Sequence, residues 1–337
     1  MLPGAPQEAQ WIRSAPRLDW PAPVLQRMVQ TAFPRSRISQ KQLLAAGLRN
    51  ANFKLTLDSS SEPVVLRIYE HDPSLCRKEI DLMRLVRHTV PVPEVIHAEP
   101  RGLEELPPFA LLQFIQGASL LDLKRRSDFE AFAQASSSAG ETLAAIGRFP
   151  FSRTGWLGPG PAVAAPLLAG ADPVPNFIDL CLAAPNLVRR VPAELRRRIH
   201  QSIWHSSHRF VELDAGPRLV HGDFSRRNLL ARQAAGRWSV VAVLDWEFAV
   251  AGTPLIDVAN FLRYEKASRP LAEPHFSTGY LRSGGALPGD WRRVSRLLDL
   301  AATCESLTRG DLPEDVATEL VELVRATVED RDPRLNP

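Results

Sequence analysis

The chain has 337 residues, of which 45% are hydrophobic and 23% are charged, a balance typical of soluble globular proteins. The formal net charge is only +3, and the scattered basic residues argue against a nucleic-acid-binding surface. No apolar run is long enough to span a membrane, and the first 20 residues resemble neither a secretory signal nor an anchor, so we expect a cytoplasmic protein with no membrane partner. Three cysteines lie far apart and lack the spacing of a zinc site, which predicts buried thiols.

The first third of the chain predicts a small antiparallel sheet with two helices. A helix is expected directly after Pro23, because proline is favoured at the start of a helix. Another is expected from Leu75 to His88, where apolar residues recur every three or four positions. Alternating apolar residues bounded by turn formers indicate strands at 52–57, 64–69, 95–98 and 109–114.

The rest of the chain predicts a mainly helical region interrupted by two loops. Helices are expected at 129–146, 177–188 and 192–213, and again after residue 250 through 323, with a surface loop at 161–175. The fold class is therefore α+β, with two lobes: a nucleotide-binding lobe over residues 1–115 and a helical lobe over 116–337. A ligand site between the lobes is the natural consequence.

Polar residues at the ends of short apolar runs between 219 and 250 carry the chemistry. His221-Gly222-Asp223 follows one such run, Asn228 comes five residues after Asp223, and Asp245 follows the apolar run from 240 to 244. A carboxylate can take the proton of a hydroxyl nucleophile, and a later amide and carboxylate can hold Mg²⁺. Any one of these residues alone is more often a turn former or helix cap, but the three together at this spacing favour a kinase.

This segment resembles the aminoglycoside phosphotransferase and choline kinase-like family, which has a protein-kinase-like fold. The family's catalytic loop reads HGDxxxxN, and its metal motif is D-x-[DEG]; here these are His221 to Asn228 and Asp245 to Glu247. The resemblance implies Asp223 as catalytic base and Asn228 and Asp245 as Mg²⁺ ligands. For Glu247 it leaves three roles open: direct ligand, ligand through water, or loop cap. His221, and Asp257 in the later segment GTPLIDVA, are expected to support the catalytic loop.

The resemblance extends to the expected nucleotide lobe. Asn50 lies in a turn similar to the family's nucleotide loop, Arg67 stands where protein kinases carry a strand lysine, and Glu79 follows on the next helix. An arginine can grip phosphate through a bidentate fork, so the pair Arg67–Glu79 is expected to hold ATP. By position, the backbone of Gln113 and Ile115 is expected to meet adenine at the hinge.

The expected activity is transfer of the γ-phosphate of ATP to a small hydroxyl acceptor, with Mg²⁺. The acceptor is left open among antibiotic-like, sugar-like and nucleoside-like alcohols. A basic trio formed by Arg226, Arg227 and Arg263 favours a neutral or anionic acceptor over a polycation. Two alternatives remain: a catalytically silent nucleotide-binding pseudokinase, and a choline or ethanolamine kinase. Candidates for the aromatic box that a quaternary ammonium needs are Trp246, Tyr264 and Trp291.

Overall fold

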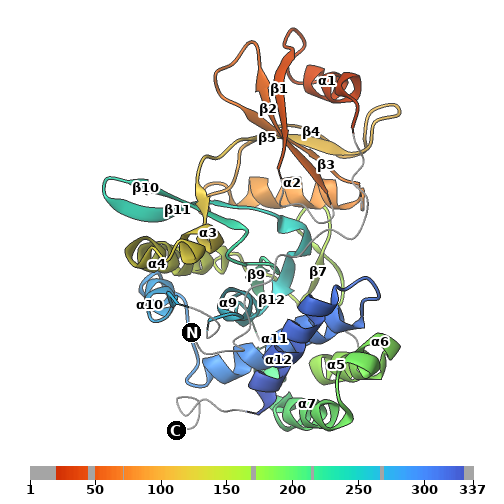
Figure 1. The fold of residues 1–337 in the computed structure, drawn as a ribbon, viewed down its shortest axis with the longest axis vertical. Helices are drawn as coiled ribbons and strands as arrows, with labels where there is room; N and C mark the ends of the chain where they lie inside the picture. The colour runs from red at the N-terminus through yellow and green to blue at the C-terminus, as the bar shows by residue number, and fades with distance from the viewer. Residues whose placement is uncertain are drawn as a thin grey trace.

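The computed structural model describes residues 20–44, 50–70, 72–167, 172–213, 216–265 and 269–329 and shows two unlike halves (Figure 1). The first half is a five-stranded antiparallel sheet with the order β1-β2-β3-β5-β4. Its elements are α1 (Ala22–Gln30), β1 (Ile38–Leu43), β2 (Ala51–Leu57), β3 (Val64–Ile68), α2 (Leu75–Val86), β4 (Val95–Glu99) and β5 (Phe109–Gln113). The four predicted strands and both predicted helices are confirmed.

Strand β1 was not expected from the sequence. Its residues ISQKQL are mostly exposed, because the strand lies at the edge of the sheet and pairs only with β2. Such a strand buries little apolar surface, so it lacks the period-two pattern that reveals the others. Its mainly polar character also protects an open sheet edge from pairing with other chains.

Helices cover both faces of this sheet. Side chains alternate between the faces along β5, so Phe109 and Leu111 pack with α1, whereas Ala110 and Leu112 belong to the core that contains α2. The α1 side is closed by Leu25, Met28 and Val29. This packing fixes β3 between two neighbours and directs Arg67 toward α2.

After the linker 114–117, the chain enters the helical half. Its first elements are β6 (Ala118–Ser119), α3 (Leu120–Arg125) and α4 (Phe129–Ile146), and α4 has the predicted bounds. The Asp128 side chain caps α4 by accepting a hydrogen bond from the Ala131 amide. Two short sheets follow, with the orders β11-β10-β6 and β8-β7-β12-β9. Their strands are β7 (Gly155–Leu157), β8 (Val163–Ala165), β9 (Arg218–Val220), β10 (Leu229–Ala234), β11 (Arg237–Val243) and β12 (Val250–Gly252).

Two of the predicted helices are each divided in the structure. The region 177–188 contains α5 (Pro173–Ala183) and α6 (Pro185–Arg190), because the residue before Pro185 is extended. The region 192–213 contains α7 (Ala193–His205) and α8 (Ser207–Leu213). The expected loop 161–175 also includes β8 and the start of α5. The helices that follow are α9 (Leu255–Leu262), α10 (His275–Arg282), α11 (Trp291–Thr308) and α12 (Glu314–Val328).

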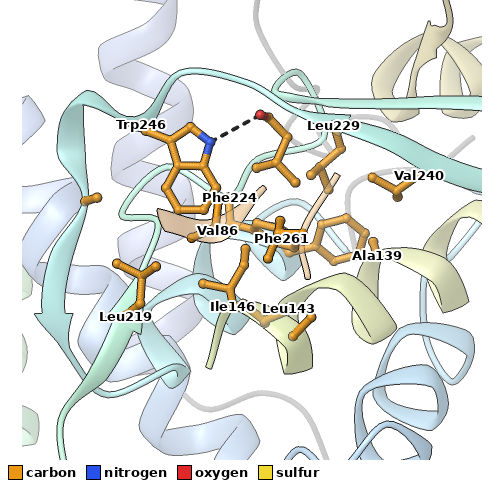
Figure 2. Packing of buried hydrophobic residues seen from close by; sticks show 14 of the residues in the cluster. Val86, Ala139, Leu143, Ile146, Leu219, Phe224, Leu229, Val240, Trp246 and Phe261 are labelled. Carbon is orange, nitrogen blue, oxygen red and sulfur yellow. Dashed lines mark hydrogen bonds between the residues drawn. The ribbon is translucent and has the colours of Figure 1, made fainter. Parts of the chain in front are cut away.

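The helical half contains two hydrophobic cores. One unites α5 to α8 with α11 and α12. The other joins α4, α9 and the short strands, and it continues into the first half through α2 and β5; residues such as Phe224, Trp246 and Phe261 fill its centre (Figure 2). The Trp246 indole donates a hydrogen bond to the Val243 carbonyl, which satisfies its buried N–H at 3.2 Å. The three cysteine thiols are buried as predicted, and no helix within the described ranges has the length and apolar character needed to cross a bilayer.

Candidate active site

The loop that leaves β9 is shaped by a glycine. Gly222 has a positive φ of +80°, and a Cβ built there would lie 2.2 Å from the Phe248 carbonyl oxygen. Only glycine therefore fits at this position, because any side chain would clash with backbone. The tight turn brings Asp223, the predicted base, directly after the end of a buried strand.

Asp257 stabilises this turn through hydrogen bonds to its backbone. Its carboxylate accepts two backbone hydrogen bonds, from the His221 amide at 2.7 Å and from the Gly222 amide at 2.9 Å. Asp257 is fully buried in the first turn of α9. Burial raises the pKa of its carboxyl to about 7, although the two amide donors act in the opposite direction. Asp257 thus contacts the loop for which the sequence predicted it as a supporting residue.

His221 joins the catalytic loop to the loop after β11. Its Nδ1 accepts from the Asp223 amide at 3.2 Å, and its Nε2 donates to the Leu244 carbonyl at 3.0 Å. Its ring lies edge-on to the Trp246 ring with a centroid distance of 4.6 Å. Burial lowers the pKa of His221 to about 4, so the imidazole is neutral at physiological pH. A neutral ring with both nitrogens engaged suits a bracing role.

Asp223 and Asn228 are hydrogen-bonded to each other. The Asn228 amide nitrogen donates to the Asp223 carboxylate at 2.8 Å and to the Asp223 carbonyl at 3.0 Å. Burial raises the pKa of Asp223 to about 7, and the nearby Asp245 adds to this, whereas Arg263 and Asn228 oppose it. Within the described residues, no group donates to the side-chain oxygen of Asn228. That oxygen is thus available to a cation.

Asp245 adopts an uncommon backbone conformation at the start of the second loop. Its φ and ψ of 67° and 68° are left-handed, and the short 3₁₀ helix η1 (Trp246–Phe248) follows it. Leu244, directly before it, donates its amide to the Asn228 carbonyl at 2.8 Å, so the two loops lie side by side. The Asp245 side chain is 29% exposed, whereas that of Glu247 is only 4% exposed. Asp245 is therefore the carboxylate of this loop that is open to solvent.

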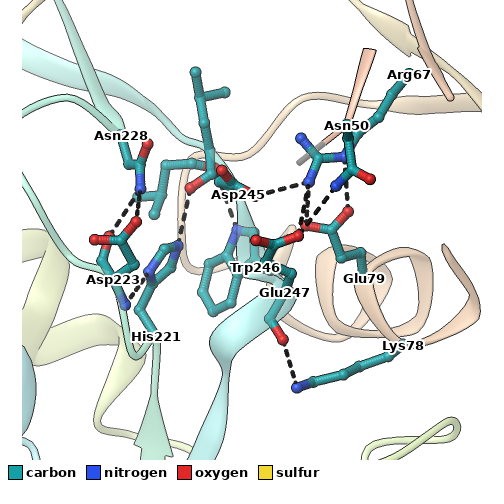
Figure 3. A network of polar contacts seen from close by, with 12 residues as sticks. Asn50, Arg67, Lys78, Glu79, His221, Asp223, Asn228, Asp245, Trp246 and Glu247 are labelled. Carbon is teal, nitrogen blue, oxygen red and sulfur yellow. Dashed lines mark hydrogen bonds and ion pairs between the residues drawn. The ribbon is translucent and has the colours of Figure 1, made fainter. Parts of the chain in front are cut away.

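A cluster of charges from the first half of the chain meets the second loop (Figure 3). The guanidinium of Arg67 contacts the Glu79 carboxylate at 2.9 Å and the Asp245 carboxylate at 2.7 Å, and it lies 3.9 Å from that of Glu247. Asn50 donates to Glu247 at 3.0 Å. Burial acts to lower the pKa of Arg67, but Glu79 and Asp245 together raise it well above its ordinary value.

One residue of this cluster gave no signal in the sequence. The ammonium of Lys78 donates to the backbone carbonyl of Glu247 at 2.7 Å, although the two residues are 169 positions apart. Lys78 precedes Glu79 on α2 and would ordinarily be taken for a solvated helix residue. Its burial becomes visible only once the second loop is placed against the helix.

The residues of the predicted hinge lie between the sheet and the helical half. Gln113 is the last residue of β5, and Ile115 lies in the linker before β6. The Gln113 amide already donates to the Glu94 carbonyl at 2.9 Å. Recognition of an adenine edge would consequently fall to other backbone groups of this linker.

The structure does not support the basic trio as a cationic patch. The Arg226 side chain is 2% exposed and pairs with Glu265 at 3.0 Å. Arg263 makes a forked contact with Asp299, with a shortest distance of 2.6 Å. Because two of the three charges are compensated inside the protein, the argument for a neutral or anionic acceptor loses its basis.

The aromatic residues considered for a quaternary ammonium are core residues. Trp246, Tyr264 and Trp291 are 1%, 7% and 7% exposed. An aromatic box needs ring faces that a ligand can reach, so this set cannot form one.

A small antiparallel lobe, a helical lobe and an Asp–Asn–Asp set facing an Arg–Glu pair define a phosphotransferase with a protein-kinase-like fold. Comparison with known families agrees. The sequence profile of the phosphotransferase enzyme family matches residues 42–297, and the chain belongs to this family. It is thus an enzyme that transfers phosphate to a hydroxyl acceptor. The comparison with curated protein sequences returned no match.

Solved structures show the same fold at low sequence identity. A thermostable mutant of aminoglycoside phosphotransferase APH(4)-Ia, in complex with ADP and hygromycin B, is 20% identical with a TM-score of 0.65, covering 91% of this chain and 98% of that one. Wild-type aminoglycoside 2'-phosphotransferase-IIIa, in complex with GDP, is 16% identical with a TM-score of 0.66, covering 93% and 100%. A putative fructosamine-3-kinase from Haemophilus somnus 129PT is 16% identical with a TM-score of 0.56, covering 90% and 96%.

Proposed function

We propose that the protein is an ATP-dependent small-molecule kinase in which Asp223 is the catalytic base. The observation that carries this proposal is the junction of the two loops. His221 and Asn228 both bond to the backbone of Leu244, which places Asp245 beside the Asp223–Asn228 pair. In a loose phosphoryl transition state the base mainly orients the hydroxyl, a task that the fixed carboxylate of Asp223 suits.

The oxygen donors beside the base fit Mg²⁺. Asn228 offers an amide oxygen and Asp245 a partly exposed carboxylate, and hard oxygen ligands of this kind are what Mg²⁺ prefers. We assign both as ligands, with the carboxylate of Glu247 as a third ligand that acts directly or through water. When bound, the ion would neutralise charge on the transferred phosphate. The protein's own part is to keep these oxygens on two loops that backbone hydrogen bonds hold together.

The nucleotide is proposed to lie between the two lobes, with the boundary between residues 115 and 116. Arg67 carries the cation that would meet the phosphates, and Glu79 orients it from α2. Asn50 borders the same cluster through Glu247. The end of β5 at Gln113 and the linker after it, which contains Ile115, are proposed to offer backbone groups to adenine. The use of ATP would suit the expected cytoplasmic location.

The acceptor is proposed to be a small polyhydroxylated molecule. The structures with the same fold include proteins named for phosphorylating aminoglycosides and fructosamines, and these compounds share several hydroxyl groups. A choline-type acceptor is disfavoured because the candidate aromatic rings are buried. A catalytically silent module is disfavoured because the proposed base, both proposed ligands and the Arg67–Glu79 pair are all present and connected by hydrogen bonds and ion pairs.

The test is ATP consumption with Mg²⁺, first without an acceptor and then with a panel of aminoglycosides, sugars and nucleosides. Wild-type protein is compared with Asp223→Ala at equal concentration. We expect at least one hydroxyl acceptor to stimulate ATP consumption in the wild type and none to do so in the variant. Mg²⁺-dependent ATP binding without turnover on any acceptor would instead indicate a nucleotide-binding module.

A further inference from the structure

Lys78 is a buried lysine whose ammonium has no carboxylate within ion-pair distance among the described residues. It is 5% exposed, and its Nζ donates to the Glu247 carbonyl at 2.7 Å while lying 5.9 Å from the centre of the Trp156 ring. Burial lowers the pKa of Lys78 to about 8, against the effect of nearby carboxylates. Burying an ammonium for a single carbonyl is costly. Burial of an apolar side chain at this position would cost less free energy, so stability alone does not explain the lysine.

The position of Lys78 links the two halves of the proposed site. Its neighbour Glu79 holds Arg67 on β3, and Lys78 itself holds the loop that contains Asp245 and Glu247. Figure 3 shows these two side chains leaving the same turn of α2 toward the cluster and toward the Glu247 carbonyl. One turn of α2 therefore contacts both the guanidinium of Arg67 and the loop that contains Asp245 and Glu247.

A second contact fixes the same helix to the helical lobe. Asp81, one turn after Arg77, accepts from the Gly160 amide at 2.9 Å and from the Arg77 guanidinium at 2.8 Å. Gly160 belongs to the connection between β7 and β8, and Trp156 of β7 lies near Lys78. Helix α2 is thus attached to the loop after Asp245 and to the β7–β8 connection at once.

We propose that Lys78 is a positioning residue that locks α2 to the 245–248 loop. By binding the Glu247 carbonyl, it fixes the loop that presents the Asp245 carboxylate to Arg67 and to the metal. Asp245 has a left-handed backbone conformation, which is unfavourable for a residue with a side chain. The position of its carboxylate therefore depends on contacts that hold the next two residues, Trp246 and Glu247, in place. The proposal rests on the proposed metal-binding role of Asp245, but its structural part stands independently of that role.

Three variants test the lock. Lys78→Met keeps the length of the side chain and removes the donor, whereas Lys78→Arg keeps a donor. Arg84→Met is the matched control, because Arg84 is an exposed residue of the same helix. The first measurement is amide hydrogen exchange at Ala249 in nucleotide-free protein, since this amide donates to the Trp246 carbonyl within the loop. We expect about tenfold faster exchange in Lys78→Met and a smaller increase in Lys78→Arg. Unchanged exchange in Lys78→Met would overturn the proposal.

The second measurement is the Mg²⁺ concentration that gives half-maximal ATP turnover, with thermal stability recorded in parallel. Lys78→Met should need about ten times more Mg²⁺ than Arg84→Met while its Tm stays the same or rises, because a costly buried charge is removed. A fall in Tm with unchanged Mg²⁺ dependence would mean that Lys78 is merely structural, and it would overturn the proposal. If wild-type turnover did not depend on Mg²⁺, the metal assignment would fail, and hydrogen exchange at Ala249 would still decide the lock.

Discussion

The two sides of the proposed site handle charge in opposite ways. On the nucleotide side, Arg67 is surrounded by three carboxylates, and each charge has an opposite charge nearby. On the acceptor side, the Asp223 carboxylate accepts from the neutral Asn228 amide, the amides of the loop donate to the Asp257 carboxylate, and His221 is neutral. A pre-formed ion-pair cluster suits the binding of phosphate and metal, whereas a carboxylate among neutral donors keeps the basicity that proton transfer needs.

The largest effect expected from this difference is on turnover. Asp223→Asn keeps the size of the side chain and an oxygen that can accept from Asn228, but it removes the proposed base. We expect turnover to fall by roughly 10² to 10⁴-fold, while nucleotide affinity and Tm hardly change. Steady-state kinetics and nucleotide titration of the purified variant measure this. Retention of more than about a tenth of wild-type turnover would show that another group takes the proton.

Removal of the cation on the nucleotide side should act on stability. Arg67→Met leaves buried carboxylates without compensation, so the free energy of unfolding should fall by about 3–5 kcal/mol. Arg67→Lys keeps the charge without the fork and should lose less. Denaturant unfolding measures both. The control is Arg27→Met, which breaks an exposed pair with Glu104 and should change stability by less than about 1 kcal/mol. Equal stability of Arg67→Met and wild type would contradict the charge-cluster interpretation.

The next prediction concerns Asp257, whose carboxylate accepts hydrogen bonds from the backbone of the catalytic loop. Asp257→Ala leaves the amides of His221 and Gly222 without a buried acceptor and should lower the free energy of unfolding by about 2–4 kcal/mol. Asp257→Asn keeps one acceptor and should lose about half as much. The exposed Asp315→Ala serves as the control for loss of a carboxylate. If both Asp257 variants unfold like the control in urea, the two hydrogen bonds do not anchor the loop.

The smallest effect expected is on the pH dependence of stability. His221 titrates near 6.5 when unfolded, but burial lowers its folded pKa to about 4. Between these values His221 binds more protons in the unfolded state, so its own contribution to the free energy of unfolding falls as pH falls, by at most about 1.4 kcal/mol per unit, whereas the raised pKa values of Asp223 and Asp257 contribute in the opposite direction. Urea unfolding from pH 7 to 4 should show that His221→Gln reduces this slope. The exposed His208→Gln should keep it, and identical slopes for all three proteins would exclude His221 as the source.

Local sequence patterns predicted most of the fold and the outline of the site. In strand β2 and helix α4 the apolar periodicity matches the burial, because one face of each packs against a hydrophobic core, whereas β5 is a continuous apolar run that is buried on both faces. The pattern failed at the edge strand β1, where most side chains face solvent, and at residues 184 and 206, where helices break locally. It also suggested a basic trio, since a sequence does not reveal that Glu265 and Asp299 would compensate two of its members.

The sequence by itself determined the class of this enzyme, a phosphotransferase, from an aspartate, an asparagine and a second aspartate at fixed spacing and an Arg–Glu pair upstream. Residue type and short-range spacing are enough there, because each loop is only a few residues long and follows a buried strand. Only the tertiary structure decided which charges compensate one another. Lys78 meets Glu247 across 169 positions, and Asn50 meets it across 197. Such contacts depend on how two lobes pack, and local periodicity carries no information about that packing.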